Sequence, residues 1–125
     1  MRIAISADNN QGLDSPVSMH FGHAAYFILA DVESKQITRV SAVANPFHGN
    51  HMPGQLPEFI RSQGAQVMLA GGMGQRAVEF FRQQGIETAT GASGTVRQSL
   101  ERYLDGGLHG VQPCADSGHQ PGCGH

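Results

Sequence analysis

The first 108 residues contain no cysteine, and the chain contains no tryptophan. Its two cysteines, Cys114 and Cys123, both lie within the last twelve residues. Metal binding by the body of the protein would therefore have to rely on histidine, a common metal ligand whose protonation changes near neutral pH. We expect the two thiols to be reduced rather than joined, because disulfides are rare in cytoplasmic proteins.

Charge and long apolar runs are also scarce. Only 14% of the residues are charged, the net charge is −2, and the eight lysines and arginines are scattered, so duplex nucleic acid is not an expected partner. The apolar run at residues 3–7 is too short for a signal peptide, and no run approaches a membrane span. These features predict a cytoplasmic protein that does not bind membranes.

A length of 125 residues suits one domain with a real core. We assign that domain to residues 1–107. Residues 108–125 are rich in glycine, proline, histidine and cysteine and lack an apolar pattern that could pack, so we expect a flexible tail.

Hydrophobic periodicity predicts three strands, then helix, strand, helix, strand, helix. The expected strands are residues 3–7, 25–32, 37–44, 67–70 and 86–89, and the expected helices are about 56–64, 75–84 and 95–105. The second and third strands read as a hairpin, and Thr95 with Gln98 reads as a capping box. A hairpin beside parallel units requires a mixed sheet. We therefore predict an α/β fold, a five-stranded mixed sheet flanked by helices on a ribonuclease-H-like plan.

The run at residues 18–23 (SMHFGH) places His20 and His23 three positions apart around Gly22. Either imidazole is a candidate metal ligand. Alternation along an extended segment would send His20 and Phe21 to opposite sides. In the alternative interpretation, His23 only hydrogen-bonds the backbone of its own loop.

The run at residues 71–74 (GGMG) leaves a buried strand and enters the second helix. Glycine lets the backbone approach a ligand closely, and amides at a helix N-terminus favour an anion. The run lacks the lysine and the serine or threonine of a nucleotide-phosphate loop. The alternative is a tight strand-to-helix connection without a ligand.

Together these segments resemble the dinitrogenase iron-molybdenum cofactor biosynthesis family, which includes NifX-like proteins and the C-terminal part of NifB-type proteins. The similarity rests on residues 18–27 (SMHFGHAAYF) and 67–77 (VMLAGGMGQRA), and on 85–86 and 91–96, and it spans roughly the whole domain. It implies a ribonuclease-H-like, non-catalytic protein that binds or carries an iron–sulfur or molybdenum-containing cluster or its precursor. Cluster donor and acceptor proteins would be its partners, and the protein would be a monomer or a weak homodimer.

The resemblance also implies a site at one edge of the sheet. His20 or His23 would ligate exposed iron, the amides of residues 72–74 would donate to sulfide, and Arg76 would balance charge. The full set of candidate binding residues is Ser18, His20, Phe21, Gly22, His23, Gly71, Gly72, Met73, Gly74 and Arg76. Because four thiolates cannot come from this chain, binding would be partial and reversible, as suits a carrier.

Three alternatives remain. The tail residues Cys114, His119, Cys123 and His125 offer the two sulfurs and two nitrogens of a zinc site, and would make the tail a metallochaperone arm for zinc or another divalent metal. In the second alternative, the chain is an interaction module that regulates a partner protein, and its loop histidines sense pH or metal. A hydrolase is the least favoured, because metal-dependent phosphodiester cleavage needs converging carboxylates and none lies inside the first strand.

Overall fold

The computed structural model describes residues 1–46 and 54–106. In these residues the α-helices and strands follow the predicted order, and their ends lie within two positions of the predicted ones. The elements are β1 (Arg2–Ala7), η1 (Gly12–Asp14), η2 (Phe21–His23), β2 (Tyr26–Glu33), β3 (Gln36–Ala44), α1 (Gln55–Ser62), β4 (Val67–Leu69), α2 (Gln75–Gln83), β5 (Glu87–Ala89) and α3 (Val96–Leu104).

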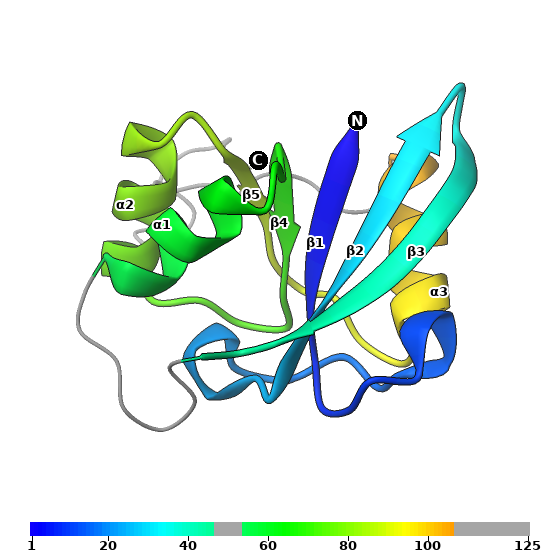
Figure 1. Ribbon diagram of the computed structural model, residues 1–125, viewed down its shortest axis with the longest axis horizontal. Helices are drawn as coiled ribbons and strands as arrows, with labels where there is room; N and C mark the ends of the chain where they lie inside the picture. The colour runs from blue at the N-terminus through cyan, green and yellow to red at the C-terminus, as the bar shows by residue number, and fades with distance from the viewer. Residues whose placement is uncertain (47–53, 107–125) are drawn as a thin grey trace, which may run out of the picture.

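The five strands form one sheet in the order β3-β2-β1-β4-β5 (Figure 1). The hairpin β2–β3 is antiparallel, and β2 also pairs antiparallel with β1. On the other side of β1, the strands β4 and β5 run parallel to it. The structure thus confirms a mixed α/β sheet flanked by helices, and its plan is compatible with the predicted ribonuclease-H-like architecture.

Both faces of the sheet are covered, because successive residues of a strand point to opposite faces. Ile3 and Ile5 of β1 join the core beneath α3, whereas Ala4 joins the core beneath α1 and α2. Each of these helices turns apolar side chains toward the sheet, as shown by Leu56 in α1 and Leu100 in α3, which are fully buried.

The carboxyl ends of the parallel strands β1, β4 and β5 meet at one edge of the sheet. The loop after β1 is bridged to β1 itself by Ala7 and Val17, and to the loop after β5 by Pro16 and Thr95. The Val17 amide also donates to the Gly94 carbonyl at 2.9 Å. These links tie the segments that follow the parallel strands into one surface.

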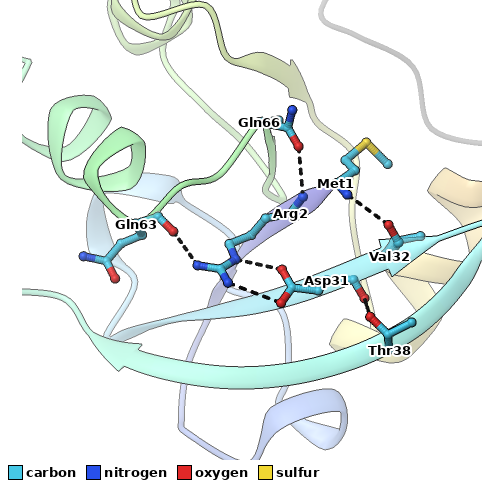
Figure 2. A network of polar contacts seen from close by, with 7 residues as sticks. All are labelled: Met1, Arg2, Asp31, Val32, Thr38, Gln63 and Gln66. Carbon is cyan, nitrogen blue, oxygen red and sulfur yellow. Dashed lines mark hydrogen bonds and ion pairs between the residues drawn. The ribbon is translucent and has the colours of Figure 1, made fainter.

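A polar network closes the opposite end of β1 (Figure 2). Arg2 donates to both carboxylate oxygens of Asp31, at 2.8 and 3.2 Å, and to the Gln63 carbonyl at 2.7 Å. It thereby joins β1, β2 and the end of α1. The hydrogen bond from Arg2 holds the pKa of the Asp31 carboxyl below its ordinary value.

Within residues 1–46 and 54–106, no helix has the length and apolar character needed to cross a membrane.

Candidate functional site

The histidine loop and the glycine turn lie against each other at the edge where the parallel strands end. The Phe21 amide donates to the Gly72 carbonyl at 3.0 Å, and the Gly71 amide donates to the Ser18 carbonyl at 3.3 Å. Residues about 50 positions apart in the sequence are thus joined by backbone hydrogen bonds. We refer to residues 18–23 together with residues 71–76 as the rim.

The two segments approach so closely that only glycine fits at position 71. A Cβ atom there would lie 2.9 Å from the Ser18 carbonyl oxygen and 3.0 Å from the Met19 Cα atom. Both are backbone atoms, which cannot swing aside as a side chain would. At Gly72 a Cβ atom would lie 3.1 Å from the Met19 oxygen and 4.0 Å from Nδ1 of His20, so this imidazole lies directly beside the glycine turn.

Both histidines of the rim are exposed. Their ring centroids are 5.9 Å apart in an edge-to-face arrangement, so the two imidazoles form a pair on the surface. Within the part of the chain that the structure describes, no group of three or more histidine, cysteine, aspartate or glutamate side chains could hold a metal ion. A ligand bound by these imidazoles would therefore need to bring most of its own coordination.

Two of the candidate residues hold the loop in place. The Phe21 side chain is only 4% exposed and packs against Phe27 and Phe81, with ring centroids 5.8 and 5.2 Å away. Ser18 is buried too, and its hydroxyl donates to the His20 carbonyl at 3.0 Å. His20 and Phe21 do face solvent and core respectively, as predicted, although a 3-10 turn rather than a strand begins at Phe21.

The glycine turn leads directly into α2, as predicted, and Gly74 is the N-cap residue without a side-chain cap. The amides of Gly72, Met73 and Gly74 donate no hydrogen bond within the described residues. Gly74 is exposed, and Gly72 and Met73 are half-buried. Arg76, two residues further on, is exposed and forms no ion pair with any described residue.

A third segment at this edge was not among the predicted site residues. The Gly91 amide, in the loop after β5, donates to the Gly71 carbonyl at 3.0 Å and so supports the glycine turn from its other side. Gly91 has a positive φ of 87°, a conformation that glycine adopts without strain. The position of this loop directly after a third parallel strand is the sequence signal that could have identified it.

The acidic residues at the ends of the first two strands, Asp8 and Asp31, do not converge as a hydrolase site would require. Asp8 follows the last residue of β1, whereas Asp31 pairs with the first residue, Arg2. At roughly 3.3 Å per residue, a strand of this length separates the two carboxylates by about 20 Å. The predicted tail ligands Cys114, His119, Cys123 and His125 lie outside the described residues.

The fold and the rim together define a class, an α/β domain with a mixed sheet whose histidine loop and glycine turn meet at one edge. The model of the dinitrogenase iron-molybdenum cofactor family matches residues 1–106. The chain belongs to this family, which confirms the resemblance predicted from the two motifs.

Solved structures show the same fold. The crystal structure of PH0822 is 36% identical in sequence, with a TM-score of 0.78, covering 90% of this chain and 98% of that one. The apo form of the orange protein from Desulfovibrio gigas is 31% identical, with a TM-score of 0.78 and coverages of 88% and 92%. A Thermotoga protein provisionally assigned as NifB (TM1290) is 25% identical, with a TM-score of 0.74, and 97% of each chain is covered.

Proposed function

We propose that this protein is a non-catalytic carrier that binds a preformed iron–sulfur or molybdenum-containing cluster, or a precursor of one, at the rim. The observation that carries the proposal is the contact between the two motifs, in which His20 lies beside Gly72. Family membership supports the choice of cargo, because the family is named for the iron-molybdenum cofactor.

The chemistry of the rim matches such a cargo. Exposed iron accepts imidazole, which His20 and His23 offer, and bridging sulfides accept hydrogen bonds, which the amides of Gly72, Met73 and Gly74 can donate. The exposed Arg76 guanidinium would offset the negative charge of the cluster. A cluster that arrives with its own sulfides needs few protein ligands, whereas a bare metal ion would need more than the two imidazoles available here.

The same arrangement favours a carrier over a resident redox centre. The rim lies on the surface and its ligands are imidazoles without thiolates, so a bound cluster would be held by few bonds and could leave again. The expected partners are therefore proteins that donate the cluster and proteins that accept it.

The test is anaerobic reconstitution of the full chain, either with iron and sulfide or with tetrathiomolybdate, followed by visible spectroscopy. We expect charge-transfer bands that are lost or weakened in His20→Ala and His23→Ala. Loss of an outer partner of a metal ligand typically costs about 10- to 100-fold in affinity, and loss of a ligand should cost at least as much. Arg76→Gln should weaken the bands as well, because it removes the charge that offsets the cluster. Its matched control is Arg102→Gln, a substitution at an exposed position of α3, which should leave the bands unchanged.

Two results would overturn the proposal. The first is the absence of bands in the wild-type chain, which would favour an interaction module. The second is bands that survive both histidine substitutions but disappear in the Cys114→Ser/Cys123→Ser variant, which would move metal binding to the tail.

A further inference from the structure

A pocket adjoins the rim and extends between the first turns of α1 and α2, and the rim contributes Phe21, Gly22, Gly74 and Arg76 to its lining. It has a volume of about 280 Å³. Its apolar walls come from Phe21, Leu56, Pro57, Ala77 and Phe80, and Arg76 is the one charged side chain among the described residues that line it. Most of this lining belongs to α1 and α2, and the α1 residues take no part in the proposed cluster site.

The size of the pocket limits the ligand. Pockets for drug-sized molecules span roughly 300 to 1,000 Å³, and this one falls just below that range. It would suit a compact molecule with a body no larger than a phenyl ring and a short side chain. The rings of Phe21 and Phe80 and the side chain of Leu56 would contact the apolar part of such a molecule.

The charge of the pocket selects among compact ligands. Among residues 1–46 and 54–106, Arg76 has no ion-pair partner, and no aspartate or glutamate lines the pocket. Glu79, the one acidic residue of α2, lines an adjoining shallow groove with Gln75 and Gln83, and this groove shares Arg76 and Phe80 with the pocket. A guanidinium pairs well with a carboxylate, because its planar N–H groups can donate two parallel hydrogen bonds.

We propose that this pocket binds a small organic acid, with the carboxylate at Arg76 and the apolar body between Phe21, Leu56 and Phe80. The proposal goes beyond cluster binding, since it involves neither His20 nor His23 and requires no metal. The protein would thus have two overlapping sites that share Arg76, one for a metallocluster and one for an apolar carboxylate.

The test uses the full chain labelled with nitrogen-15 and titrated with phenylacetate in the absence of metal. We expect saturable shifts of the amide signals of residues 76, 77 and 80. The neutral amide phenylacetamide and the cation 2-phenylethylammonium have the same apolar body and should bind more weakly, by about threefold to tenfold for the loss of a partly exposed charge pair.

Variants assign the binding to the pocket. Arg76→Gln should weaken phenylacetate binding to the level of phenylacetamide, whereas the control Arg102→Gln should not. Ala77→Phe should fill the pocket and abolish the shifts, and its amide spectrum would show whether the variant is folded. The comparison of phenylacetate, phenylacetamide and 2-phenylethylammonium on the wild-type chain tests the proposal without any variant.

Three outcomes would overturn this inference. They are equal binding of all three compounds, saturable shifts confined to residues outside the pocket, and loss of phenylacetate binding in His20→Ala, which would assign the binding to the His20 imidazole. Failure of cluster reconstitution would leave the titration unaffected, so the two proposals fail separately.

Discussion

Replacement of Gly71 by alanine should separate the two halves of the rim. The added Cβ atom would lie 2.9 Å from the Ser18 oxygen, about half an ångström inside ordinary van der Waals contact. The φ of Gly71 is not positive, so alanine is compatible with the local backbone conformation. The loss of stability therefore comes only from the contact with the neighbouring loop, whose backbone must move to make room for the Cβ atom.

The structure gives the size of the effect. A shift of half an ångström would break the hydrogen bond from the Gly71 amide to Ser18, which is already 3.3 Å long, at a cost of about 0.5–1.5 kcal/mol. Overpacking of a close contact typically costs about 1–3 kcal/mol in all. In a domain of this size, the variant should unfold roughly 5–15 °C below the wild-type chain.

Thermal unfolding followed by circular dichroism, together with urea denaturation, would measure the change. Gly74→Ala is the matched control, because a Cβ atom there meets nothing within 4 Å. It should change the free energy of unfolding by about 0.5 kcal/mol or less, as lower unfolded-state entropy offsets the weaker N-cap. Equal stability of the two variants would refute the close approach of the loops.

Three further predictions concern the cap, the polar network and the tail. Thr95→Ala removes the capping box of α3 and should lower the free energy of unfolding, measured by urea titration, by about 1 kcal/mol. Thr95→Ser should stay near the wild-type value, and an unchanged alanine variant would contradict the role of the cap. The pKa of Asp31 is lowered by Arg2, so the pair stabilises the fold above the ordinary carboxyl pKa, and this contribution is lost as the pH falls below about 4. In Asp31→Asn, the free energy of unfolding should therefore fall less steeply with decreasing pH than in the wild-type chain. Parallel plots of that free energy against pH for the two chains would refute this prediction. Zinc titrated into the full chain should bind more weakly in the Cys114→Ser/Cys123→Ser variant, and equal affinity and stoichiometry in isothermal calorimetry would remove the tail as a metal site.

Local patterns in the sequence were enough to predict the order of the elements. Alternation and helical spacing depend on residues only a few positions apart, and the turn signals are equally local. Gly64, with a φ of 83°, ends α1 as expected, and Thr95 with Gln98 forms the predicted capping box. The two motifs of the rim were also recognisable, because each is a continuous run with its own chemistry.

Tertiary packing decided what those runs do together. The strand order β3-β2-β1-β4-β5 depends on contacts between distant residues, and it brings the loops after β1, β4 and β5 to one edge. Only this packing buries Phe21, requires glycine at position 71 and forms the pocket at Arg76 from parts of three segments. The sequence therefore determined the elements and the chemistry they carry, while the long-range contacts of the sheet decided which of these groups meet.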